Sequence, residues 1–290
     1  MRSVLKTISF NNVMFRKKML IIYLVGIFFP MLIISSFYCG SVINRFKETN
    51  IREIEFDTEV TAEAIERVID KARMMSDEIY YNTSLNKRLL TKSGSINDFL
   101  DIAEEINSLT RYAVIYDFVE SVRIYTFNDK LYRTPVLLKI SDIEEDAYWY
   151  KEFLSLDTDY SVISYYDEAR EKSCISIVRR LRNYGRCNDI LKIDISYASI
   201  TNEMIYNKEK GSFCLFNENN ICIATSKGEQ VAEYLGCSYE QISKKSNVIE
   251  RKLQLPVGFT MYCEYENNYA ANVATEILWF ILLIGAVLMV

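Results

Sequence analysis

A run of 20 residues without a charged side chain, MLIIYLVGIFFPMLIISSFY at positions 19–38, constrains the fold of this chain more than any other feature. At a rise of about 1.5 Å per residue, a helix of this length spans the ~30 Å hydrocarbon core of a bilayer. Pro30 is tolerable inside such a helix and is expected to kink it. Five basic residues and no acidic residue precede the run, which predicts a cytoplasmic N-terminus at residues 1–18 and a transmembrane helix at residues 19–38.

A cleaved signal peptide and a lipoprotein are the alternatives to an uncleaved membrane anchor. A signal peptide has a shorter apolar stretch of about 7–15 residues, which ends in small residues at the cleavage site. Phe37 and Tyr38 occupy those positions here, and Tyr38 is also too large for the residue before the lipid-carrying cysteine that Cys39 would have to be. The sequence therefore favours the uncleaved anchor.

A second apolar run, ILWFILLIGAVLMV, occupies residues 277–290. Fourteen residues are too few to cross a bilayer comfortably, so a short tail or a buried strand is one interpretation. Because no charge interrupts the run, we favour the start of a second transmembrane helix that continues into a cytoplasmic part absent from this sequence.

Composition excludes most catalytic classes. The chain has no histidine, which rules out Ser-His-Asp and Cys-His catalysis and a phospho-accepting histidine, and its 9 glycines form no phosphate-binding loop.

Subtracting the charge of +5 on residues 1–18 from the total of −5 leaves −10 on the rest of the chain. This acidic balance argues against nucleic acid as a partner. Neither a cofactor nor a metal site is expected.

Six of the 7 cysteines lie between the two apolar runs: Cys174, Cys187, Cys214, Cys222, Cys237 and Cys263. Outside the membrane they could form three disulfides, with Cys214 and Cys222 facing each other across a hairpin. We favour the alternative in which they are small apolar core residues, and no CxxC spacing points to zinc.

A long helix is expected to follow the membrane run at residues 39–80. No glycine or proline occurs from residue 41 to residue 93, and a seam with three- and four-residue spacing runs through this segment. The seam comprises Ile51, Ile54, Thr58, Thr61, Ile65, Val68, Ala72, Met75 and Ile79. It can pair with a second copy of the chain or pack on a sheet, and we expect both.

Short runs of alternating polarity follow a second helical stretch at residues 96–118, and they predict strands. The strands are expected at residues 121–127, 130–133, 160–164, 174–179 and 189–195, with a turn at Asn128 and Asp129 joining the first two into a hairpin. A short helix is expected at residues 143–154. This order predicts an α+β fold in which an antiparallel sheet carries helices on one side.

A smaller unit follows a helix near residues 200–206. Its expected strands are at residues 212–216, 221–225, 248–255 and 257–265, which form two hairpins. The sequence therefore predicts a membrane-distal lobe at residues 81–200, a membrane-proximal lobe at residues 201–273, and an extracellular location for residues 39–276.

Three segments give this layout a family resemblance: AYWYKEFL at 147–154, CISIVRRLRNYGRCNDILKIDISYASI at 174–200, and FCLFNENNICIATS at 213–226. Together with the two apolar runs and the long helix, they resemble the double Cache (dCache) sensor region of YesM-like sensor histidine kinases. The resemblance implies two PAS-like (Cache) antiparallel-sheet lobes on a membrane-anchored stalk helix. It also implies an extracellular small-molecule sensor whose cytoplasmic kinase part lies beyond Val290.

The same resemblance implies a ligand site in the distal lobe, formed by Trp149, Tyr150, Tyr165 and Asp194. Amino-acid-sensing relatives place an arginine two residues before the tryptophan, where it can hold a carboxylate. This chain has Ala147 there, so Arg123 is the substitute candidate, and a sugar or oligosaccharide is favoured over an amino acid or peptide. The alternative to a ligand site is a purely structural role, in which Trp149 and Tyr150 are core aromatic residues and Asp194 caps a helix.

The resemblance further implies a homodimer formed through the stalk and transmembrane helices. Alternative outputs are a chemotaxis receptor, a cyclic-dinucleotide enzyme and a membrane-tethered transcription regulator. A stand-alone membrane-anchored binding protein is the alternative from another class. None of these interpretations makes the 290 residues themselves an enzyme.

Overall fold

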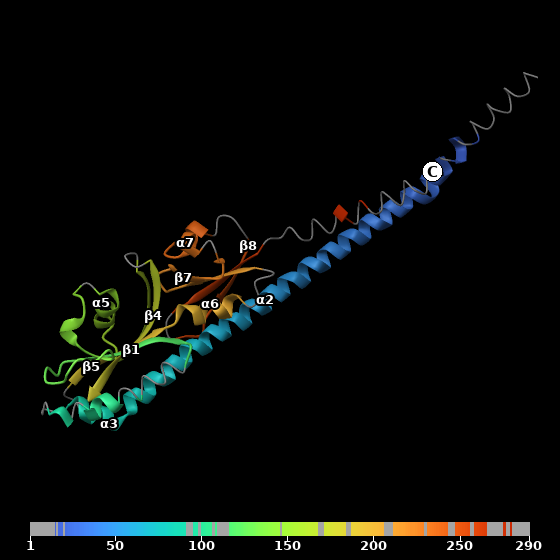
Figure 1. Ribbon diagram of the computed structural model, residues 1–290. Coiled ribbons are helices and arrows are strands. Elements are labelled where there is room, and N and C mark those ends of the chain that lie inside the picture. Colours follow the sequence, from blue (N-terminus) through green and yellow to red (C-terminus); the bar gives the residue numbers. More distant parts are fainter. Residues whose placement is uncertain are drawn as a thin grey trace, which may run out of the picture. The chain divides into compact units, whose positions relative to one another are not determined.

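The computed structural model contains two compact units, residues 1–53 with 266–290 and residues 54–265, and each is described by itself. The residues described are 15, 17–19, 21–90, 95–97, 100–105, 108, 116–145, 147–167, 171–183, 187–205, 211–228, 231–242, 247–255, 258–265, 275, 276 and 279. In Figure 1 the long helix is blue to cyan, the first sheet is green to yellow, and the second sheet is orange to red.

The first unit is dominated by the N-terminal helix. By length and composition, the helix Lys17–Tyr81 is the one among the described residues that could cross a membrane. A π-helical turn, η1 (Leu24–Phe28), precedes α2 (Phe29–Tyr81), in which Pro30 is the second residue. Pro30 has no N–H to donate to a carbonyl of the preceding turn. The irregular π-helical turn therefore lies just before the residue at which the sequence predicts a disturbance of the helix. The predicted second membrane helix at residues 277–290 lies outside the described residues except for position 279.

In the second unit, α2 buries the predicted seam within its own chain. Ile54, Thr58, Ile65, Ala72 and Ile79 are each at most 5% exposed. The seam therefore packs against the rest of this unit, which confirms one of the two expectations made for it. A short helix, α3 (Thr83–Leu89), follows α2, and the described residues between 96 and 108 are helical, whereas residues 116–118 are not.

The first sheet has five strands in the order β2-β1-β5-β4-β3. Their bounds are β1 (Val119–Thr126), β2 (Leu137–Lys139), β3 (Tyr160–Asp167), β4 (Lys172–Asn183) and β5 (Cys187–Ile195), and η2 (Ile140–Asp142) and α5 (Tyr148–Ser155) lie between β2 and β3. All neighbouring strands are antiparallel except β1 and β2, which are parallel.

The prediction of a hairpin between strands at residues 121–127 and 130–133 is wrong, because residues 130–133 do not form a strand. The Thr134 hydroxyl accepts hydrogen bonds from the backbone N–H groups of Val136 (3.3 Å) and Leu137 (2.9 Å), so the chain turns there. Pro135 has no N–H for a ladder, and the chain returns as β2, parallel to β1 rather than antiparallel.

Helices cover both faces of this sheet, so the expectation of helices on one side is also wrong. On one face, Val122, Ile177 and Ile193 share a core cluster with Ile65 and Ile69 of α2. On the other face, Trp149 and Phe153 of α5 form a separate cluster, which contains Tyr125, Ile163, Val178 and Ile190. Strand periodicity explains the division, because successive side chains point to opposite faces.

Arg179 of β4 fastens the first sheet to α2. Its guanidinium pairs with Asp77 and lies 4.2 Å from the centre of the Tyr80 ring, and only 13% of its side chain is exposed. The charge is therefore held between a carboxylate and an aromatic face of the helix.

The second sheet has four strands in the order β7-β6-β9-β8, with all pairings antiparallel. Its elements are α6 (Tyr197–Ile205), β6 (Ser212–Phe216), β7 (Cys222–Thr225), α7 (Val231–Tyr234), α8 (Tyr239–Ile242), β8 (Asn247–Lys252) and β9 (Thr260–Tyr265). Cys214, Cys222 and Cys263 are buried free thiols in its core. The structure therefore agrees with the core interpretation for these three, whereas Cys174 and Cys237 are free thiols that are only half-buried.

Candidate functional site

A row of polar side chains crosses the middle of the first sheet on the face that α5 covers. The strand register places Ser121 of β1 and Ser176 of β4 on either side of Asp194 of β5. The Ser121 hydroxyl donates to Asp194 Oδ2 (2.7 Å), and the Ser176 hydroxyl donates to Asp194 Oδ1 (2.6 Å). Three strands thus converge on one carboxylate.

Lys192 supplies a cation to the same carboxylate. Its ammonium pairs with Asp194 Oδ1, and the two side chains are only 6% and 16% exposed, respectively. Burial alone would raise the pKa of Asp194, but the Lys192 charge and the two serine hydroxyls outweigh burial, and the pKa lies below its ordinary value. Asp194 is therefore ionised at neutral pH, with its charge matched inside the protein.

Aromatic side chains lie beside this ion pair. Trp149 is 6% exposed, its ring centre lies 5.3 Å from the Lys192 ammonium, and it is 5.3 Å from the Tyr125 ring centre and 5.6 Å from that of Tyr150. Tyr165 of β3 joins this group through Tyr148 of α5, because the ring centres of these two residues are 5.1 Å apart. Burial, together with the neighbouring Cys174, raises the pKa of Tyr165, so its hydroxyl stays protonated.

The five residues expected from the sequence share this region. Trp149 and Tyr150 lie on α5, while Tyr165, Asp194 and Arg123 lie on strands, with the last two on the same face by register and alternation. Arg123 is exposed and interacts with Tyr125 rather than with Asp194. Whether these residues touch a ligand stays a prediction.

Sequence reasoning missed Lys192, Ser121 and Ser176. The first was within reach, since in the strand LKIDI the side chains of Lys192 and Asp194 must point to the same face. The two serines depend on strand register between segments far apart in the chain, which no local pattern reveals.

The arrangement places aromatic faces beside hydrogen-bonding and charged groups. Aromatic rings offer faces for apolar or sugar-ring surfaces, and the ion pair and hydroxyls offer hydrogen bonds beside them. At Ala147, the N-cap of α5, no side chain caps the helix, and the guanidinium that would clamp a carboxylate is absent. Within the described ranges, no three His, Cys, Asp or Glu side chains are grouped in a way that could hold a metal ion.

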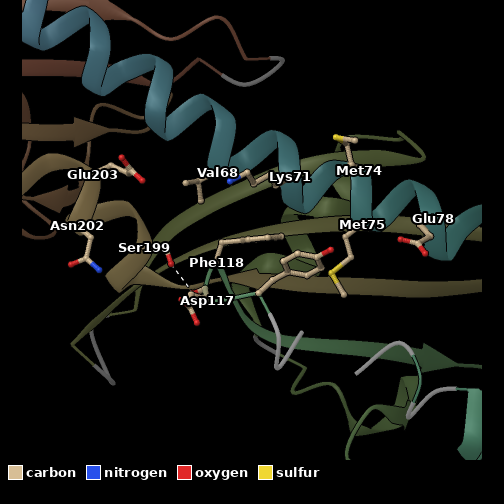
Figure 2. A pocket seen from close by; sticks show the side chains of 11 residues that line it. Val68, Lys71, Met74, Met75, Glu78, Asp117, Phe118, Ser199, Asn202 and Glu203 are labelled. Carbon is tan, nitrogen blue, oxygen red and sulfur yellow. Dashed lines mark hydrogen bonds between the residues drawn. The ribbon is translucent and has the colours of Figure 1, made fainter. Parts of the chain in front are cut away.

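A groove of about 810 Å³ lies on the other side of the sheet, between α2, the segment before β1, and α6. Figure 2 shows Val68 and Met75 of α2 near Phe118, and the Ser199 hydroxyl donating to the backbone carbonyl of Asp117 (2.7 Å). The groove contains none of the five predicted site residues, so it is a separate feature of the molecule.

Comparison with known proteins places the fold. No family model and no curated protein matches the chain. Among solved structures, the ligand-binding domain of the Pseudomonas fluorescens chemoreceptor CtaA in complex with L-isoleucine is similar, with a TM-score of 0.55 and 14% identity, over 79% of this chain and 98% of that one. The extracellular domain of the "putative histidine kinase vpHK1S-Z8" is similar with a TM-score of 0.55 and 11% identity, over 79% of this chain and 99% of that one.

The chain has the double Cache fold. The ligand-binding domain of the Campylobacter jejuni chemoreceptor Tlp3 in complex with 4-methylisoleucine agrees, with a TM-score of 0.51, 17% identity, and coverage of 77% of this chain and 93% of that one. The double Cache resemblance expected from the three sequence segments is thus confirmed for the fold. The similar domains come from both chemoreceptors and a kinase-type protein, so the fold does not distinguish between output types.

Proposed function

We propose that the chain is the extracellular small-molecule sensor of a transmembrane receptor. The observation that carries this proposal is the double Cache fold, joined to a helix long and apolar enough to span a membrane. The structurally similar domains of CtaA and Tlp3 bind amino acids or a close derivative.

The ligand site of this proposal is the α5 face of the first sheet, with Trp149, Tyr150, Tyr165 and Asp194 as contact residues and Arg123 at its edge. Lys192 already neutralises Asp194, so an ammonium group would have to displace a buried cation to pair with this carboxylate. That favours an uncharged, hydroxyl-rich ligand such as a sugar or oligosaccharide over an α-amino acid.

The division of the chain follows from this function. Residues 1–18 would be cytoplasmic, 19–38 the first transmembrane helix, 39–80 the stalk, 81–200 the distal lobe, 201–273 the proximal lobe, and 277–290 the start of the second transmembrane helix. In the whole protein, ligand binding would bias the positions of the two membrane helices, and a homodimer formed through the stalk and membrane helices would bring the cytoplasmic parts together.

A sensor histidine kinase is the output that we favour, on the resemblance of the three sequence segments. The chemotaxis-receptor output is the second candidate, because similar domains occur in such receptors. The reading frame after Val290 decides between them: a histidine-containing dimerisation and kinase region supports the first, and a long methylated coiled coil supports the second.

Thermal unfolding of the full chain in detergent tests the ligand proposal. Candidate ligands are glucose, galactose and maltose on one side, and L-isoleucine, L-serine and GABA on the other. A ligand at about 100 times its Kd stabilises the folded state by about 2.7 kcal/mol, which raises the Tm of a unit this size by about 5–10 °C.

The variant Tyr150→Ala should abolish that shift without unfolding the chain, since Tyr150 is only half-buried. The matched control is Tyr81→Ala, which removes a 71% exposed tyrosine at the end of α2 and should leave the shift intact. A shift produced by amino acids alone would overturn the sugar preference. A ligand shift that survives Tyr150→Ala, Asp194→Asn and Trp149→Phe would overturn the location of the site.

A further inference from the structure

The turn between β6 and β7 of the second sheet lies against the first sheet next to the candidate ligand site. Asn217 begins this turn and is only 3% exposed. Its side-chain Nδ2 donates a hydrogen bond to the backbone carbonyl of Ser164 in β3 (3.1 Å), and this bond is buried. A buried amide of this kind is costly to leave unpaired, so it fixes the turn to β3.

The other end of the Asn217 amide holds the turn itself. Asn217 Oδ1 accepts hydrogen bonds from the backbone N–H groups of Asn219 (3.1 Å) and Ile221 (3.0 Å). One side chain therefore performs two separable tasks. Its oxygen shapes the turn, and its nitrogen ties the turn to β3.

Two further contacts join the same parts. The Tyr148 hydroxyl lies close to the Asn219 side chain, and the Tyr148 ring packs 5.1 Å from Tyr165 of the candidate site. Tyr166 lies so close to Gly236 in the second lobe that a Cβ there would be 2.7 Å from Tyr166 Cδ1. Gly236 also has a φ of +78°, which favours glycine.

These contacts involve three consecutive residues of β3. Tyr165 belongs to the candidate ligand site, while its neighbours Ser164 and Tyr166 touch the second lobe. A shift of the β3 backbone at Tyr165 would therefore act on both neighbours that contact the second lobe.

We propose that Asn217 is a positioning residue that couples the candidate ligand site of the first lobe to the second lobe, through Ser164 of β3. The inference rests on the proposed sensor function for its biological meaning, but its physical content is a coupling between two parts of the chain. Asn217 itself contacts no ligand in this scheme.

Asn217→Asp separates the two tasks of the side chain. A carboxylate still accepts the hydrogen bonds of the turn, but it faces the Ser164 carbonyl with an oxygen in place of a donor. The matched control is Asn220→Asp, which makes the same chemical change in the same turn, at a residue with a φ of +62° that aspartate tolerates.

Hydrogen–deuterium exchange of the full chain in detergent measures the outcome without any ligand. In Asn217→Asp, amides near Ser164 in β3 should exchange at least about fivefold faster, while the strands β6 and β7 keep their protection and Asn220→Asp behaves as wild type. Unchanged exchange of β3 in Asn217→Asp would overturn the contact.

The coupling is tested by the substitution Tyr165→Ala, which perturbs the candidate site. In the wild-type background this change should accelerate exchange in β6 and β7, and in the Asn217→Asp background it should have no such effect. An equal effect in both backgrounds would overturn the proposal. Because no ligand enters the experiment, a chain that binds none of the tested compounds still decides this inference separately from the proposed function.

Discussion

Removing the buried cation next to Asp194 should destabilise the first lobe and change the pH dependence of its stability. In Lys192→Met the side chain keeps most of its apolar stem but loses the ammonium that pairs with Asp194. The carboxylate, 16% exposed, is left with two serine hydroxyls as partners. The variant thus leaves a charge largely buried without an opposite charge.

The expected loss is at the lower end of the range for breaking a buried ion pair, about 3 kcal/mol, because the two hydroxyls still stabilise the carboxylate. For a unit of this size, the Tm falls by about 6–12 °C. Thermal or urea unfolding of the full chain at pH 7 measures this loss directly.

The sign of the pH effect follows from the pKa of Asp194. In the wild type, burial raises this pKa, and Lys192 together with the hydroxyls of Ser176 and Ser121 lowers it by more, so the carboxylate adds stability above pH ~4, and that stability is lost as the pH falls below it. In Lys192→Met, burial dominates and the pKa rises, so protonation relieves the destabilisation. The difference in Tm between the two proteins should therefore shrink between pH 7 and pH 4.

The double variant Lys192→Met/Asp194→Asn is the control, because it removes both charges. It should recover most of the lost stability, since a neutral amide needs no counter-charge. A Lys192→Met variant that costs less than about 1 kcal/mol, or a double variant whose loss equals the sum of the single losses, would refute the reasoning.

Three other substitutions test separate contacts. Arg179→Met should lower the free energy of unfolding by about 2 kcal/mol in urea titrations, because it removes the ion pair with Asp77 and the cation–π contact; no loss would show that this contact does not stabilise the lobe. Asn82→Ala should cost about 1 kcal/mol in the same assay, since Asn82 Oδ1 accepts from the backbone N–H of the third residue of α3 (3.0 Å), whereas Asn82→Ser should cost less. Burial lowers the pKa of Lys227, but the hydrogen bonds to Glu264 and Tyr234 and the charge of Glu264 together raise it by more, so the Lys227–Glu264 pair stabilises the fold below pH ~10 and loses its effect above it. Tm profiles of wild type and Glu264→Gln should converge above that pH, and parallel profiles would contradict the assignment.

Local patterns predicted most of the elements because their causes are local. The alternation in DILKIDI and CISIVRR identified two central strands, and the three- and four-residue spacing of the seam identified the buried face of α2. The error at β2 had a non-local cause, because the three-residue strand forms only by pairing with β1. Helices on both faces of the first sheet were missed because the side to which α5 returns is set by tertiary packing.

The residues of the candidate site likewise fall into those that the sequence predicted and those that it did not. Trp149, Tyr150, Tyr165 and Asp194 were identified through family resemblance, and the structure brings them to one region of one lobe. The partners of the carboxylate were not predictable, since Ser121 lies 73 residues from Asp194 in sequence and meets it only through strand register. The charge state of the site therefore became visible only in three dimensions.

The alternation of side chains along β4 has a consequence for how far a signal must travel. Ser176 and Val178 point toward α5 and the ion pair, while Ile177 and Arg179, their immediate neighbours, point toward α2. A molecule bound on one side and the long helix on the other are separated by the thickness of a single extended chain. β4 contacts the candidate site with one set of side chains and α2 with the alternate set. A shift of the β4 backbone therefore reaches both the candidate site and α2 without a relay of intervening side chains.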